Sequence, residues 1–279
     1  MDNIKTDKNN YDFQGQQLPD GRKMPRRFSL NAFDHRPFEQ FARLDKMDWR
    51  FWTPLVVIVT SLNIVWWYLP LHYSSHTLQV PFTWQLAPMM GYTLTTSIAI
   101  ALIITQNFRS YLSYLFIVLG TLFTFTSLIQ TRQEIFWLLL LFNALLIIIQ
   151  QLWLGIQNIL GLLLFGALAT FTIPIALFYV QNDFITQRFL IYLLPVFFSF
   201  FFYFTPIIMP NPNGRKLSIL TLALFIVAIF SHHVDFGIIF ILLFSCAAFV
   251  LQFTKAKIGN WQNMLYVLLQ MISLIIMYH

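Results

Sequence analysis

The chain has 279 residues, of which 58% are hydrophobic and only 10% are charged, and its formal net charge is +6. Soluble domains carry about 25% charged residues, so this composition excludes an ordinary soluble protein and favours a membrane protein. In such a protein the positive excess indicates loops that face anionic lipid, and nucleic-acid binding is not expected.

The first fifty residues differ from the rest, because they are polar and hold ten Lys/Arg and eight Asp/Glu. Residues 1–25 show no hydrophobic periodicity, and residues 1–50 as a whole are predicted to form a cytoplasmic tail without a cleavable signal peptide. Residues 37–48 place apolar side chains among charges, which predicts a helix on the membrane surface or, equally, a simple lead-in to the first span. A basic cluster near this span predicts contact with anionic lipid through Arg22, Lys23, Arg26 and Arg27.

Nine long apolar runs follow this tail, and each approaches the length of about 20 residues that a membrane-spanning helix needs. Residues 51–279 are therefore predicted to form an all-α fold, a polytopic integral membrane helix bundle of about nine transmembrane helices. The seventh run is expected to give the shortest helix. The predicted spans cover residues 51–71, 88–105, 111–129, 135–153, 159–180, 189–209, 217–232, 236–253 and 261–278.

The basic residues between these runs predict the orientation of the bundle. Arg109, the pair Arg215 and Lys216, and the pair Lys255 and Lys257 occupy gaps on one side, and the gaps on the other side carry no net positive charge. Because positive loops stay cytoplasmic, the N-terminus is predicted inside and the C-terminus outside.

Two further features bear on this orientation. The gap at residues 150–158 has no charge; a single kinked helix there would invert every later loop and violate the charge rule.

Tryptophan rings are expected at headgroup depth, because the ring is apolar while its N–H needs a polar partner. The expected positions are Trp49, Trp52, Trp153 and Trp261 inside, and Trp66, Trp67, Trp84 and Trp137 outside.

The middles of the predicted spans contain no Asp, Glu, Lys or Arg, which argues against a proton or sodium relay. Their uncharged polar side chains must still find partners in hydrocarbon. Helix–helix hydrogen bonds, at about 1 kcal/mol each, are the ordinary use, and a substrate path is the alternative. The candidate intramembrane residues are Asn63, Asn143, Gln270, Thr95 and Thr124, and the prolines that can kink spans are Pro88, Pro174, Pro195 and Pro206.

Five of the six histidines map to the predicted outer face. Imidazoles next to a carboxylate are suitable ligands for zinc or another transition metal, and neutral imidazoles would alternatively form a pH-responsive rim. The sequence holds no fixed metal motif, so no cofactor is predicted beyond this option. The candidate ligands are His232, His233 and Asp235, with His72 and His76 as partners that share one face if helical.

The sequence carries no phosphate-binding glycine loop and no GxSxG motif, so a non-enzyme is favoured. The leading prediction is a transport-type protein: a permease, channel or membrane subunit for a neutral or apolar small molecule. The alternative is a non-catalytic accessory or scaffold subunit of a membrane or cell-envelope complex, which binds its partner through residues 22–50. A membrane enzyme with an outward-facing His/Asp metal site is the third hypothesis. All three place the chain in the lipid bilayer of a bacterial cell membrane, beside a partner protein or a second copy.

Overall fold

A computed structural model describes residues 49–78, 86–151, 154–232, 236–253 and 259–279. The chain divides into two units, Met1–Lys46 and Met47–His279, and all the described residues belong to the second unit. The predicted tail, its basic cluster and the surface helix at residues 37–48 lie outside the described residues.

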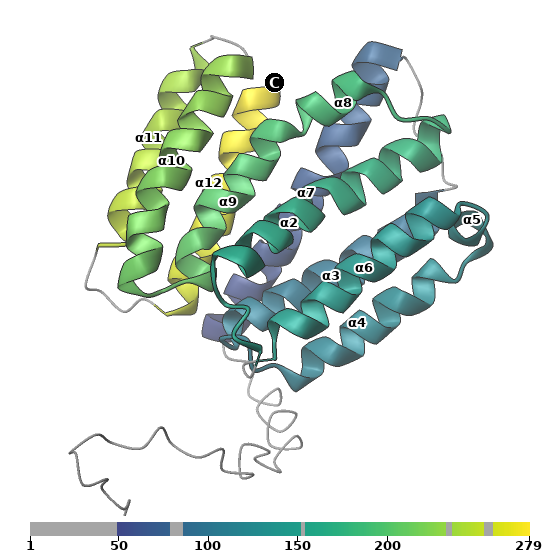
Figure 1. Ribbon diagram of the computed structural model, residues 1–279, viewed down its shortest axis with the longest axis horizontal. Coiled ribbons are helices and arrows are strands. Elements are labelled where there is room, and N and C mark those ends of the chain that lie inside the picture. Colours follow the sequence, from purple (N-terminus) through teal and green to yellow (C-terminus); the bar gives the residue numbers. More distant parts are fainter. Residues whose placement is uncertain (1–48, 79–85, 152–153, 233–235, 254–258) are drawn as a thin grey trace, which may run out of the picture. The chain divides into compact units, whose positions relative to one another are not determined.

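Every regular element in the described residues is a helix, as the all-α prediction requires (Figure 1). Each of the nine predicted runs corresponds to one helix or to two consecutive helices. The elements are α2 (Trp49–Tyr73), the π-helix η3 (Ser74–Leu78), α3 (Ala87–Thr105), α4 (Tyr111–Thr124), α5 (Ser127–Gln130), α6 (Gln133–Ile149), α7 (Ile159–Asn182), α8 (Gln187–Tyr192), α9 (Leu194–Ile208), α10 (Pro212–His232), α11 (Gly237–Leu251) and α12 (Asn260–Tyr278).

Among the described residues, six helical segments are long and apolar enough to cross a membrane, which fits a multi-pass membrane protein. The other three apolar helices are shorter, and the 14 residues of α4 rise only about 21 Å against a hydrocarbon core of about 30 Å. The prediction that the seventh run gives the shortest helix is wrong. Pro212 is a suitable first helical residue, so α10 starts there, includes the basic pair after it, and reaches 21 residues.

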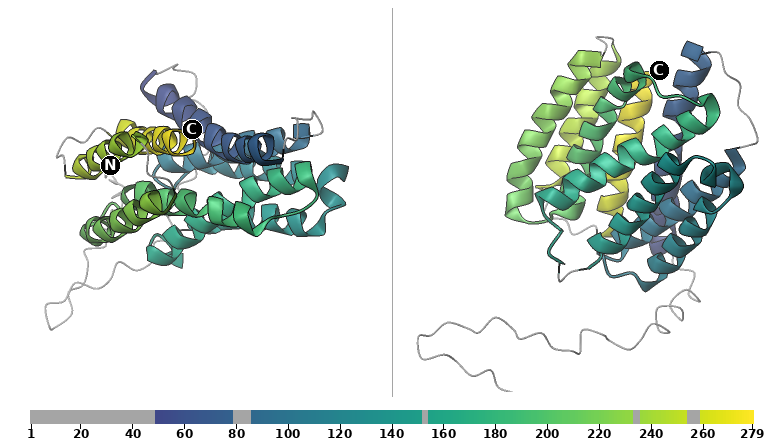
Figure 2. Two further views of the ribbon diagram at one scale, coloured as in Figure 1. Left: turned by 90° about the horizontal axis from the view of Figure 1, so that it is seen from above. Right: turned by 45° about the vertical axis from the view of Figure 1, so that its right-hand side comes forward.

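The helices of this unit pack in two layers (Figure 2). One layer holds α11, α12, α2 and α3 in that spatial order, and the other holds α10, α9, α7 and α6. Helix α4 packs on both α3 and α6 and so joins the layers on one side, while α2 contacts α7 and α12 contacts α9 between them. Helices from both halves of the sequence therefore meet at the centre of the bundle.

Basic side chains lie at one end of the bundle and histidines at the other. The end with Arg109, Arg215 and Lys216 is called the basic end, and the end with His72 and His279 is called the histidine end. The uncharged gap before α7 separates two helices, since α6 ends at Ile149 and α7 begins at Ile159. A single kinked helix in this region is therefore excluded.

Prolines and one asparagine lie at the starts or within several helices. Pro88 and Pro195 lie in the first turns of α3 and α9, whereas Pro174 and Pro206 lie inside α7 and α9, where each removes a backbone donor. At the start of α7 the Asn158 side chain accepts a hydrogen bond from the backbone N–H three residues on, as N-capping residues do.

Trp66, one of the predicted interfacial tryptophans, is buried within the bundle. Its ring is 0% exposed and packs edge-to-face on Phe142 at 6.3 Å, and its N–H donates to the Ala169 carbonyl at 2.9 Å. The polar partner that the indole N–H needs is therefore a carbonyl inside the bundle. Trp49 and Trp137 are 78% and 64% exposed, as expected for interfacial rings.

Candidate functional site

Asn143 is the centre of a buried polar cluster between α3, α4 and α6. Its Nδ2 donates to Thr121 Oγ1 at 3.0 Å, and its Oδ1 lies 3.2 Å from the Tyr92 hydroxyl. Tyr92 also donates to the Leu139 carbonyl at 2.9 Å. Both ends of the Asn143 amide are thus engaged by neighbouring helices.

The threonines of α3 take part in a close approach to α4 at Gly120. A Cβ atom at Gly120 would lie 3.2 Å from Thr95 Oγ1, 3.4 Å from Thr96 Oγ1 and 3.5 Å from Asn143 Nδ2. Thr95 itself donates to backbone carbonyls of its own helix, and Thr124 does the same in α4. Thr95 and Thr96 of α3 therefore meet Gly120 of α4 across a tight helix pair, which is typical of small and hydroxyl residues at membrane interfaces.

Asn63 links α2 to α3 beside this cluster. Its Nδ2 donates to Ser97 Oγ at 2.6 Å and to the Val59 carbonyl at 2.9 Å. One turn further along α2, the N–H of Trp67 donates to Thr93 Oγ1 at 3.0 Å. The α2–α3 interface is therefore joined by side-chain hydrogen bonds at two levels.

Gln270 belongs to a second buried network in the other half of the bundle. Its Nε2 donates to Ser199 Oγ at 3.1 Å, joining α12 to α9. The Tyr203 hydroxyl of α9 lies 2.9 Å from Ser273 Oγ and 3.4 Å from Ser245 Oγ. This network ties α9, α11 and α12 together, and its members are at most 1% exposed.

The predicted pair His72 and His76 does share one face at the histidine end, with ring centroids 4.3 Å apart. Tyr68 packs on His72 at 5.2 Å, and His72 also interacts electrostatically with His279. The described residues contain no group of three or more His, Cys, Asp or Glu side chains that could hold a metal ion. His233 and Asp235 lie outside the described residues and His232 closes α10, so a metal centre here stays a prediction.

Arg132 forms a cross-link at the histidine end. It pairs with Asp183, donates to the Val180 carbonyl at 3.3 Å, and lies 5.7 Å over the Tyr179 ring. The guanidinium therefore meets the carboxyl-terminal turn of α7, where a cation is favoured by the unpaired carbonyls.

Replacing Arg132 by Gln is expected to lower the free energy of unfolding by about 1 kcal/mol, because the carbonyl contact and the ion pair are lost together. Asp183→Asn, which leaves the carbonyl contact in place, should cost about half as much, since the Asp183 side chain is 76% exposed. Thermal unfolding in detergent measures both, and an Asp183→Asn effect as large as that of Arg132→Gln would contradict this account.

Sequence reasoning missed the tyrosines and the buried tryptophan that complete these networks. Tyr92, Tyr203 and Trp66 stand in apolar runs, where they resemble ordinary bulky residues or belt residues. Their signal is chemical, because a hydroxyl or indole N–H within a span needs an acceptor. The acceptors come from helices far apart in sequence, so periodicity alone cannot identify them.

Comparison of the chain with known protein families, with characterised proteins and with solved structures finds no match.

Proposed function

We propose that this protein is a non-catalytic accessory or scaffold subunit of a membrane complex. The observation that supports the proposal is that the polar side chains within the predicted spans of this protein form hydrogen bonds between helices. Asn143, Asn63 and Gln270, the groups best suited to contact a substrate, each donate a hydrogen bond to a neighbouring helix. Such bonds stabilise a membrane bundle by about 1 kcal/mol each and set the register of its helices.

The proposed subunit crosses a bacterial cell membrane nine times, with its N-terminus in the cytoplasm and its C-terminus outside. The positions of Arg109, Arg215 and Lys216 at one end of the bundle support this orientation through the positive-inside rule. Ile219, Val227 and similar large apolar side chains are more than half exposed along α10, as expected for a face in contact with lipid.

A transport-type protein for a neutral or apolar small molecule is the second candidate. Pro174 and Pro206 lie inside α7 and α9, and interrupted helices line the binding sites of many transporters. In that case opening a path would require the Asn143 and Asn63 bonds to break, which makes this candidate the less favoured.

The two candidate functions predict different results when the protein is purified from its membrane in detergent. The full chain, tagged at its C-terminus, should be extracted from its native membrane in a mild detergent with a second polypeptide in fixed stoichiometry. Deletion of residues 1–46 should release that polypeptide, because it removes most of residues 22–50, the proposed attachment for the partner. A chain that migrates alone, and that is stabilised against heat by one compound from a panel of neutral small molecules, would instead support transport.

Asn143→Leu is expected to lower the free energy of unfolding by about 2 kcal/mol, because it removes two inter-helix hydrogen bonds at buried positions. Thermal unfolding in detergent measures the loss. Thr131→Val is the matched control, since the exposed Thr131 hydroxyl donates only to the Leu128 carbonyl of its own turn. A wild-type melting temperature for Asn143→Leu would mean that the cluster is not structural and would weaken the proposal.

A further inference from the structure

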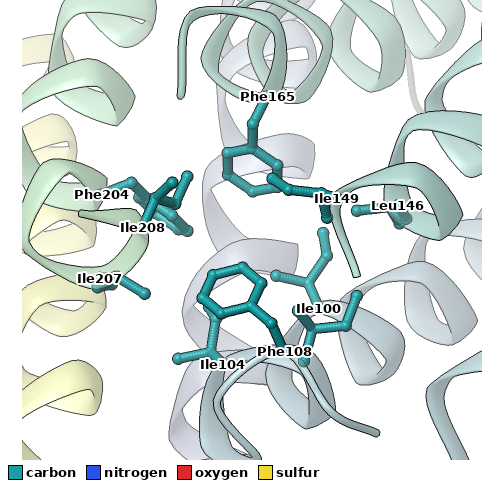
Figure 3. A pocket seen from close by; sticks show the side chains of 10 residues that line it. Ile100, Ile104, Phe108, Leu146, Ile149, Phe165, Phe204, Ile207 and Ile208 are labelled. Atoms are coloured by element: carbon teal, nitrogen blue, oxygen red, sulfur yellow. The ribbon is translucent and has the colours of Figure 1, made fainter. Parts of the chain in front are cut away.

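A carbon-lined crevice opens near the basic end of the bundle, between α3, α6, α7 and α9 (Figure 3). Its walls include Ile104 of α3, Leu146 of α6, Phe165 of α7 and Ile208 of α9. The ring of Phe108 projects into it and leaves room for about one water molecule. An apolar space of this kind excludes water and accepts hydrocarbon.

Phe108 is held in the crevice by the way α3 ends. The N–H of Phe108 donates to the Ile103 carbonyl at 2.8 Å, and that of Asn107 donates to the Ile104 carbonyl at 3.4 Å. This pair of bonds forms a Schellman stop, in which Asn107 takes the left-handed conformation that such stops require. Phe108 also has a left-handed backbone conformation, at φ 61°, which is uncommon for a bulky residue. Burial of the ring therefore has to offset the cost of this backbone conformation.

The next residue, Arg109, is exposed, whereas Phe108 is buried. In the part of the chain that the structure describes, the carboxylates are Glu134 and Asp183, and both lie at the histidine end. An exposed guanidinium without a carboxylate partner among the described residues therefore directly follows a residue that lines an apolar crevice, and this combination matches an amphiphile with a hydrocarbon chain and an anionic head.

We propose that this crevice binds one anionic phospholipid. An acyl chain takes the place of the Phe108 ring between α3, α6, α7 and α9, and the phosphate accepts hydrogen bonds from the Arg109 guanidinium, which suits phosphate geometry. All four helices that form the crevice are apolar, and α3, α7 and the segment that contains α9 are long enough to cross a bilayer, so lipid chains are its natural neighbours. This inference does not depend on the accessory-subunit proposal, since either candidate protein would carry the site.

Photo-cross-linking tests the site directly on the full chain in detergent. The probe is phosphatidylglycerol with a diazirine in one acyl chain, and mass spectrometry locates the labelled peptides. We expect label on crevice residues such as Phe165 and Ile208, displaced by unlabelled phosphatidylglycerol but neither by phosphatidylcholine with the same chains nor by inorganic phosphate.

Three variants distinguish this site from general lipid contact. Arg109→Gln should reduce crevice labelling roughly tenfold, as expected for loss of a charge-assisted phosphate contact. Arg215→Gln should leave it unchanged, because that exposed cation at the same end lies over Phe253 at 5.8 Å. Phe108→Ala should increase labelling, since it empties the crevice.

The melting temperature of each variant without lipid shows whether it is folded. Labelling by phosphatidylcholine equal to that by phosphatidylglycerol would overturn the proposal. Label confined to exposed helix faces, or equal losses in Arg109→Gln and Arg215→Gln, would do the same.

Discussion

Trp66→Ala should lower the free energy of unfolding by about 4 kcal/mol, the largest loss that we expect from one side chain in this bundle. The indole is fully buried where α2, α6 and α7 meet, in edge-to-face contact with Phe142. Its removal leaves a cavity between both layers and deletes the hydrogen bond to the Ala169 carbonyl. Thermal or denaturant unfolding in detergent measures the change.

Two further variants divide this loss into its parts. Trp66→Phe keeps most of the ring but cannot donate to Ala169, so it should cost about 1–2 kcal/mol. Trp137→Ala removes the same side chain from a position that is 64% exposed, and it should cost less than about 1 kcal/mol. Equal losses at Trp66 and Trp137 would show that Trp66 is not a core residue.

The helices of this fold could be predicted from sequence with boundaries close to those observed. Long apolar runs and the polar gaps between them are local features, and they locate helix ends such as Thr105 and Ile159 well. Apolarity predicts too short a helix at residues 212–232, because Arg215 and Lys216 read as loop residues, whereas Pro212 starts the helix before them. An apolar run predicts the part of a helix that lies in lipid, but it does not predict where the whole helix begins and ends.

The candidate site could be predicted only in part. Asn143, Asn63 and Gln270 stand out because amides are rare in spans, and each does form an inter-helix bond. The sequence could not show that Gln270 lies in a separate network from Asn143, since that depends on which helices are neighbours. The crevice at Phe108 was also missed, because its ten lining side chains are the apolar residues of which the rest of the chain consists.

A repeated turn gives the second large prediction. Asn158 and Asn211 each accept a hydrogen bond from the backbone N–H of the glycine three residues on, at 3.1 Å for Gly161 and 2.8 Å for Gly214. In both turns the carbonyl two residues before the asparagine packs on that glycine, so that a Cβ there would lie only 1.9 Å from the carbonyl oxygen. The starts of α7 and α10 therefore use the same Asn-x-x-Gly turn.

Gly161→Ala should lower the free energy of unfolding by about 3 kcal/mol, because the new methyl group meets the Ile156 backbone, which cannot move without breaking the cap. Gly166→Ala, five residues on in α7, is the matched control. A Cβ there would have Phe197 as its nearest neighbour, at an ordinary contact distance of 3.7 Å, and alanine favours helix by up to about 1 kcal/mol.

The same chemical change in one helix should thus destabilise at one position and be neutral or stabilising at the other. Melting temperatures in detergent decide the comparison, with Gly214→Ala expected to behave like Gly161→Ala. If both variants in α7 melt alike, the turn is not the determinant of where α7 begins. Helix propensity alone would then explain the effects of both substitutions, and the close carbonyl contact at Gly161 would not contribute to the free energy of unfolding.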